Sequence, residues 1–123
     1  MAVSMKDFRT LKVWEKSHQL TLSVYDKTRQ FPREELFGLA SQIRRSCSSI
    51  PANIAEGCGR STDPDFSRFL QIAFGSANEL EYHLILARDL QYLTIEDHAD
   101  IANDLTEVKK MIASLIAKIK ADR

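Results

Sequence analysis

Few residues in this chain could bind a metal or activate a water, and their spacing limits what they can do. Glu15 and His18 form one Glu-x-x-His pair, the unit that holds di-iron centres in helical bundles. Such a centre needs a second pair and two further glutamates on facing helices. Glu79, Glu81 and His83 are close together in the sequence but do not have that spacing. We therefore expect no metal site and no cofactor.

The candidate nucleophiles lack partners that would activate them. Ser48 and Ser49 have no histidine nearby in the sequence, and Cys47 and Cys58 have no second cysteine or histidine pair with which to form a zinc site. The two cysteines are 11 residues apart, so on one helix they would lie about 16 Å apart, too far for a disulfide. The glycines that flank Cys58 are too close together to cradle a phosphate. The chain is predicted not to be an enzyme.

The remaining polar residues of interest stand in a segment of small, nearly uncharged side chains, residues 46–59. Asn53 and Glu56 flank Ile54 there, in otherwise apolar company. If they are buried, each must be hydrogen-bonded, either to a ligand or to a neighbouring helix. We favour the second interpretation because buried polar groups are usually satisfied within the protein.

Four amphipathic helices are expected to position these residues. Apolar side chains recur at steps of three and four, no strand pattern appears, and the breaks between helices are a few residues long. The first helix has two neighbouring stripes, one of Leu11, Trp14, His18, Thr21 and Tyr25 and one of Val13, Ser17, Leu20, Val24 and Phe31. The core stripes predicted for the other helices are Leu36, Ala40, Ile43, Cys47, Ile50 and Ile54; Phe66, Leu70, Ala73, Ala77, Leu80 and Leu84; and Ile101, Leu105, Val108, Ile112, Leu115 and Ile119. The fold class is therefore all-α: an antiparallel, up-down-up-down four-helix bundle. It forms one domain over residues 1–123, with helices at about 10–30, 34–57, 63–90 and 95–121.

Local signals set the expected ends of these helices. N-caps are predicted at Thr10, at Thr94 and at either Thr62 or the residue after it. The apolar stripe of the second helix continues in phase past Pro51, which predicts one helix with a proline kink rather than two helices. Gly57 is expected to help end that helix.

The first and third helices carry more apolar residues than one bundle-facing side requires. Monomers rarely expose large apolar patches. The chain is therefore expected to assemble with copies of itself. The residues expected near the contacts between copies are Trp14, Leu22, Ile72 and Phe74.

A close crossing of the second and third helices is predicted at Gly75. A glycine within a helix costs about 1 kcal/mol relative to alanine, and close packing against Ser49 and its neighbours is the simplest compensation. The alternative is that Gly75 is merely tolerated. Arg44 or Arg45 is expected to pair with Glu79 beside the crossing.

Charge is unevenly distributed although the formal net charge is zero. Residues 1–33 carry seven basic and three acidic side chains, a net +4, whereas residues 61–93 carry two basic and five acidic ones, a net −3. Segments of opposite sign can pair within or between chains or face an external partner. A nucleic-acid interface, with binding that weakens steeply as salt is added, would use Arg9, Lys12, Lys16, Arg44, Arg45 and Arg60.

Targeting signals are not apparent. The first residues have no apolar core of the signal-peptide kind, and no apolar run approaches the ~20 residues needed to cross a membrane. We expect the protein to be cytoplasmic, without a membrane partner.

Two stretches resemble the four-helix bundle proteins that are encoded in the intervening sequences of some bacterial 23S rRNA genes. They are residues 49–57, which read SIPANIAEG, and residues 69–81, which read FLQIAFGSANELE; residues 13–16 and 31–39 are also similar. The resemblance implies a bundle that assembles as a homopentameric ring, with no established catalytic activity. The positions that carry it include Ser49, Pro51, Asn53, Glu56, Gly57, Gly75, Ser76, Glu79 and Glu81.

A related branch of that family, the accessory proteins of diversity-generating retroelements, works with a reverse transcriptase and binds nucleic acid. Those relatives are strongly basic, whereas this chain is neutral, with a sequence pI near 6.8. We therefore expect a non-catalytic, homo-oligomeric scaffold, pentameric by resemblance, whose other partner is a protein. The alternative is an accessory module that binds RNA or DNA through a basic surface displayed by the ring.

Overall fold

Four long α-helices and two short 3₁₀ helices make up residues 7–122, the part of the chain that the computed structural model describes. No strand occurs within these residues, so the prediction of an all-α fold is confirmed. The elements are η2 (Phe8–Thr10), α1 (Lys12–Thr28), η3 (Arg33–Glu35), α2 (Leu39–Cys58), α3 (Asp63–Asp89) and α4 (Ile95–Ala121).

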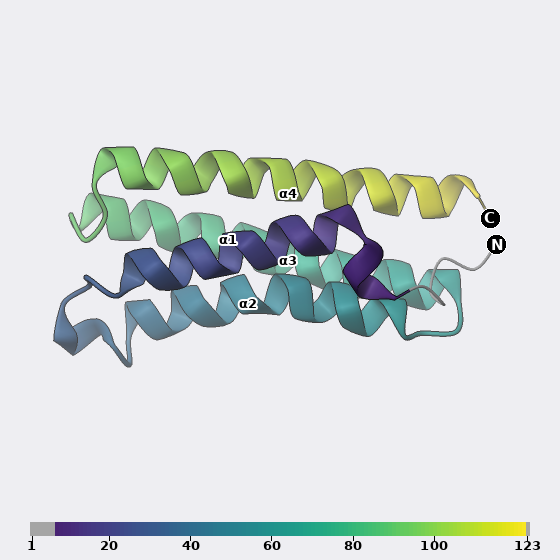
Figure 1. Cartoon of the computed structure of the whole chain (residues 1–123), viewed down its shortest axis with the longest axis horizontal. Coiled ribbons are helices and arrows are strands. Elements are labelled where there is room, and N and C mark those ends of the chain that lie inside the picture. The colour runs from purple at the N-terminus through teal and green to yellow at the C-terminus, as the bar shows by residue number, and fades with distance from the viewer. Residues whose placement is uncertain (1–6, 123) are drawn as a thin grey trace.

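The long helices run alternately in opposite directions (Figure 1). Each packs against the next in the chain, and α1 also packs against α4. The α1–α2 turn and the α3–α4 turn therefore lie at the same end of the bundle. We call this end, made of residues 29–38 and 90–95, the two-turn end. The α2–α3 turn lies at the opposite end.

The core is built from the apolar stripes that the sequence pattern predicts. Every member of the predicted α3 stripe is buried, and α4 buries all of its stripe except the partly buried Leu115. On α1, the second of the two predicted stripes faces the core, and the first lies at its margin. The buried α1 residues are Val13, Ser17, Leu20, Val24 and Thr28.

Side-chain caps begin α3 and α4 as expected, but not α1. The Thr62 hydroxyl accepts from the Asp65 backbone N–H at 3.3 Å, and the Thr94 hydroxyl accepts from the Asp97 N–H at 3.0 Å. Thr10 was predicted to cap α1, which is wrong. It lies in η2, where its hydroxyl donates to the Asp7 carbonyl, and α1 begins after Leu11 without a side-chain cap.

The second long helix begins later than the predicted residue 34. Residues 33–35 form the 3₁₀ helix η3, and α2 starts only at Leu39, after Gly38. Glu35 supplies the cap instead: its Oε1 accepts from the Leu39 N–H at 3.0 Å. Leu36, predicted as the first core residue of this helix, lies in the turn and is exposed.

Pro51 lies inside α2 and is buried. The helix continues past it to Cys58, in agreement with one helix rather than two. A bend at the proline, expected from its missing N–H and its clash with the preceding turn, stays a prediction.

Candidate functional site

The small-residue segment of α2 meets α3 through a pair of hydroxyl groups. Ser49 Oγ lies 2.9 Å from Ser76 Oγ. Asn53, one helical turn after Ser49, donates both amide hydrogens to that serine, to its carbonyl at 2.8 Å and to its hydroxyl at 2.9 Å. All three side chains are half-buried. The Asn53 amide thus has no donor left for a ligand.

This cluster has the wrong partners for nucleophilic chemistry. A serine hydroxyl becomes nucleophilic when a histidine or another base takes its proton. Within residues 7–122, neither Ser49 nor Ser76 is hydrogen-bonded to a histidine or a carboxylate. The hydroxyl pair therefore joins α2 to α3.

A polar groove of about 250 Å³ runs beside the hydroxyl pair, with Arg45 and Glu79 among its lining residues. The expected ion pair between Glu79 and an arginine is not formed, so that prediction is wrong. The nearest basic group to Glu79 is His83 Nδ1 at 4.0 Å. Arg44 turns to α1 instead: its Nε donates to the Thr28 hydroxyl at 2.9 Å. The exposed charges of Arg45 and Glu79 stay in water, where pairing contributes little.

The close approach between α2 and α3 occurs at Gly57, not at Gly75. A Cβ at Gly57 would lie 2.7 Å from Phe66 Cδ1 and 3.0 Å from Phe69 Cβ. Gly57 therefore leaves room for the Phe66 ring and for the base of the Phe69 side chain, and α2 ends one residue later. Gly75 faces away from the contact, and a Cβ there would meet nothing within 4 Å. The predicted crossing at Gly75 is wrong because that residue is one position, about 100° of helix rotation, from Ser76.

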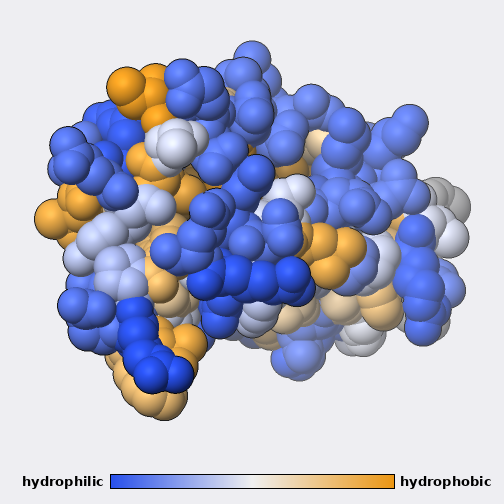
Figure 2. Space-filling view, turned by 60° about the vertical axis from the view of Figure 1, so that its left-hand side comes forward, coloured by the Kyte–Doolittle hydropathy of each residue, from blue (hydrophilic) through white to orange (hydrophobic). Residues whose placement is uncertain are grey.

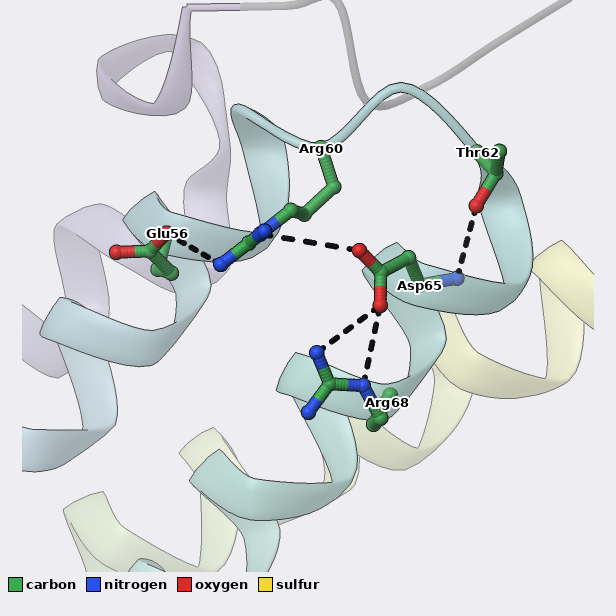
Figure 3. A network of polar contacts seen from close by, with 5 residues as sticks. All are labelled: Glu56, Arg60, Thr62, Asp65 and Arg68. Carbon is green, nitrogen blue, oxygen red and sulfur yellow. Dashed lines mark hydrogen bonds and ion pairs between the residues drawn. The ribbon is translucent and has the colours of Figure 1, made fainter.

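An ion-pair network closes the α2–α3 turn (Figure 3). Glu56, whose burial the sequence left open, is exposed and bonds to Arg60 at 2.9 Å. Arg60 reaches Asp65 at 3.8 Å, and Arg68 bonds to the same carboxylate at 3.0 Å. Both guanidinium groups lie over the Phe69 ring, at 4.6 and 4.5 Å from its centre. The network covers Phe69, one of the two phenylalanines that pack against Gly57. It therefore stabilises the turn.

Several of the basic residues proposed for nucleic-acid binding already have partners. Arg9 pairs with Asp7 at 2.9 Å, and Lys16 with Glu107 at 2.9 Å. Arg60 belongs to the turn network, and the Arg44 guanidinium lies 4.9 Å from the centre of the Tyr25 ring. Carboxylate-paired cations give up their partners before they can contact phosphates, which weakens their contribution. Nucleic-acid binding stays a prediction.

The four residues expected near subunit contacts differ in exposure. Leu22 is 53% exposed and Ile72 is 42% exposed. Trp14 is half-buried, stacked on His18 with ring centres 5.1 Å apart. Phe74 is also half-buried, with the Lys109 ammonium 5.5 Å from its ring centre, and Lys109 in turn bonds to Glu81 at 2.7 Å. The two aromatic residues therefore pack within their own chain.

Sequence reasoning missed the most exposed apolar residues. Phe37 is 92% exposed and Ile95 is 74% exposed. Phe37 lies off the core stripe of the predicted second helix, and Ile95 lies off the core stripe of α4. That position was the one available signal. Most members of this set lie at the two-turn end, where Figure 2 shows hydrophobic surface among polar groups. The exposed large apolar residues that the prediction omitted are Tyr25, Leu36, Phe37, Tyr82, Leu90 and Ile95.

The two cysteines are buried, and neither forms a disulfide. Burial raises the pKa of Cys47 to about 11, although the nearby Thr21 hydroxyl partly opposes the rise. Burial likewise raises the pKa of Cys58. Thiols with raised pKa values are poor nucleophiles and poor metal ligands at neutral pH.

Within residues 7–122, no group of three or more His, Cys, Asp or Glu side chains is arranged to hold a metal ion. None of the helices in this range combines the length and apolar character needed to span a bilayer.

Comparison with known proteins identifies a family and similar solved structures. The model of the 23S rRNA-intervening sequence protein family matches residues 9–114. A crystal structure from Bacteroides thetaiotaomicron, described as a protein with unknown function from the S23 ribosomal protein family, is similar with a TM-score of 0.79 and 35% sequence identity. That match covers 85% of this chain and 95% of the other. No curated protein matches.

Proposed function

This chain belongs to the family of 23S rRNA-intervening sequence proteins, and from that premise we propose that it acts as a non-catalytic, homo-oligomeric scaffold. The expected assembly is a pentameric ring of identical bundles. Its task is to present a surface to another protein. Neither the hydroxyl pair of α2 and α3 nor the buried thiols have the partners that catalysis requires.

One observation carries the proposal: large apolar side chains remain exposed after the bundle has buried its core. Phe37, Ile95, Tyr82 and Leu22 are each more than half exposed. Burying one such side chain contributes about 1.5–3 kcal/mol. Contact with further copies is a direct way to remove several of them from water at once.

Nucleic-acid binding remains the alternative and receives less support. Arg9, Lys16 and Arg60 are paired with carboxylates of their own chain. The formal net charge of zero provides no overall attraction to a polyanion.

Light scattering coupled to size-exclusion chromatography tests the proposal. The monomer has a mass of 14.0 kDa, so five copies give about 70 kDa. We expect a multimer at micromolar protein concentrations, and one that persists in high salt because apolar contacts are not screened. Native mass spectrometry then counts the subunits. A 14 kDa monomer at all accessible concentrations would contradict the proposed function.

A further inference from the structure

Four exposed apolar side chains are concentrated at the two-turn end of the bundle. Leu36 and Phe37 belong to the α1–α2 turn, and we call this pair the knob. Leu90 and Ile95 belong to the α3–α4 turn, which lies at the same end (Figure 1) and is joined to the α1–α2 turn by the hydrogen bond from the Tyr92 hydroxyl to Glu35. The space-filling view of this end shows separate hydrophobic areas divided by polar groups (Figure 2). The side chains of both turns stay exposed in the single chain.

The turn that carries the knob is held in place by Glu35. One oxygen of its carboxylate accepts from the Leu39 N–H at 3.0 Å, and the other accepts from the Tyr92 hydroxyl at 3.2 Å. A Cβ at Gly38 would lie 2.7 Å from the first of these oxygens. Glycine at that position therefore makes room for the carboxylate. Phe37 is thus exposed on a fixed turn, which lowers the entropy cost of docking it.

The α3–α4 turn is also fixed, and it borders a hollow of about 550 Å³. The Tyr92 N–H donates to the Ala87 carbonyl at 2.8 Å and the Gln91 N–H to the Arg88 carbonyl at 2.9 Å, the hydrogen bonds of a Schellman motif. Gln91 takes the left-handed position, with φ 66°, where glycine would be strain-free. A strained residue beside a hollow points to a function for that surface. The hollow is lined by Arg88, Asp89, Gln91, Tyr92, Leu93, Thr94 and Ile95.

We propose that the knob of one copy docks into the α3–α4 hollow of the next copy, with Phe37 as the anchor. This inference rests on the proposed homo-oligomeric function and names the contact that builds it. One such contact covers the apolar residues of both turns, Phe37 and Leu36 from one copy and Ile95 and Leu90 from the other. A phenyl side chain is much smaller than the hollow, which leaves room for its neighbours.

Charges beside the two surfaces complement each other. Arg33 and Glu34 are exposed next to the knob, and neither forms an ion pair with another residue in 7–122. Arg88 and Asp89 border the hollow, bonded to each other at 3.0 Å. The knob of one copy and the hollow of the next therefore each carry an acid and a base. Docking allows Glu34 to pair with Arg88 and Arg33 to pair with Asp89.

A second copy of the chain is the partner because every copy carries both surfaces, the exposed knob and the hollow. Knob and hollow are different surfaces, so the contact is head-to-tail, and the same rotation repeats from copy to copy. Such a contact forms a closed ring when the rotation divides a full turn evenly. The knob and the hollow belong to neighbouring turns of this end but are separate surfaces, so each copy presents both.

Single variants test the two surfaces by light scattering. We expect Phe37→Ser and Ile95→Ser each to raise the subunit dissociation constant about 10- to 150-fold, from the loss of one buried side chain. Tyr82→Ser is the matched control, since Tyr82 is 59% exposed but lies about 12 Å along α3 from Leu90. It should leave the assembly unchanged. Circular dichroism verifies that each variant is folded. If Phe37→Ser assembles like the unchanged chain, the inference is wrong although the proposed function stands.

A mixing experiment tests the head-to-tail geometry. Phe37→Ser keeps an intact hollow, and Ile95→Ser keeps an intact knob. Mixed together they should form a heterodimer through the one remaining native contact, whereas each alone stays monomeric at the same concentration. Absence of the heterodimer would overturn the pairing.

A charge-swap experiment tests the proposed orientation. Glu34→Arg should weaken the assembly, and adding Arg88→Glu to the same chain should restore it. Failure of this rescue counts against the proposed orientation.

Discussion

The two helical glycines offer the sharpest test of how α2 and α3 pack. Gly57→Ala places a Cβ 2.7 Å from Phe66 Cδ1, on a ring that is fully buried. Gly75→Ala places a Cβ where no atom lies within 4 Å. Both residues are inside helices, so the gain in helix propensity is the same for each, about 1 kcal/mol. The difference in unfolding free energy between the two variants therefore measures the crowding at Gly57 alone.

Crowding in a well-packed core costs about 1–3 kcal/mol. We therefore expect Gly57→Ala to lower the free energy of unfolding by up to about 2 kcal/mol, after its propensity gain. Gly75→Ala should raise it by up to about 1 kcal/mol. For a chain of this length, 1 kcal/mol corresponds to a shift of about 4 °C in Tm.

Urea unfolding followed by circular dichroism measures both free energies. The stability of an oligomer depends on protein concentration, so the two variants are compared at one concentration. The comparison is then repeated in chains that also carry Phe37→Ser, under conditions where light scattering reports a monomer. The reasoning would be refuted if, in the monomer, Gly75→Ala destabilised the fold as much as Gly57→Ala. That result would mean that Gly75 is in close contact with a neighbouring helix.

Two further predictions concern titrating side chains. Burial, and secondarily the charge of Arg88, lower the pKa of His98 below 6.5. The folded state therefore binds this proton less readily than the unfolded state. The contribution of His98 to stability is present above about pH 6.5 and is lost as the pH falls through the folded pKa. When Tm is measured from pH 7.5 to 5, it should fall less for His98→Gln than for the unchanged chain. Cys47, whose pKa is raised to about 11 by burial, should react with a thiol reagent at pH 8 only when the bundle opens, so its labelling rate should rise with urea, and rapid labelling of the native protein would contradict its burial.

The helices could be predicted from the sequence because one physical rule decides them. Steps of three and four place apolar residues on one face, and burial of that face outweighs the local preferences of single residues. The α3 stripe, from Phe66 to Leu84, is buried throughout as predicted. On α1 two stripes competed, and the one with smaller side chains, including Ser17, faces the core. The pattern alone could not choose between them, because the choice depends on how much room the other helices leave.

The α1–α2 turn could not be predicted because its contacts are distant in the sequence. Two consecutive glutamates after a proline are typical of a helix N-terminus, and the predicted start at residue 34 followed that pattern. In the structure, Glu35 binds Tyr92, 57 residues away, and caps Leu39 from the preceding turn. These bonds keep Leu36 and Phe37 outside the helix and outside the core. Local sequence patterns contain no information about such a partner.

The polar cluster and the apolar end therefore do different things. Asn53 uses both of its amide hydrogens on Ser49, and the Ser49 hydroxyl is shared with Ser76, so the cluster has little hydrogen-bonding capacity left for a ligand. A satisfied polar contact of this kind specifies one alignment of two helices, and this alignment sets Gly57 against Phe66. The apolar residues of the two-turn end, in contrast, have no such partners: they are held on fixed turns and remain exposed to water. The free energy available for recognition lies there, which is why we expect a partner to bind at that end rather than at the serines.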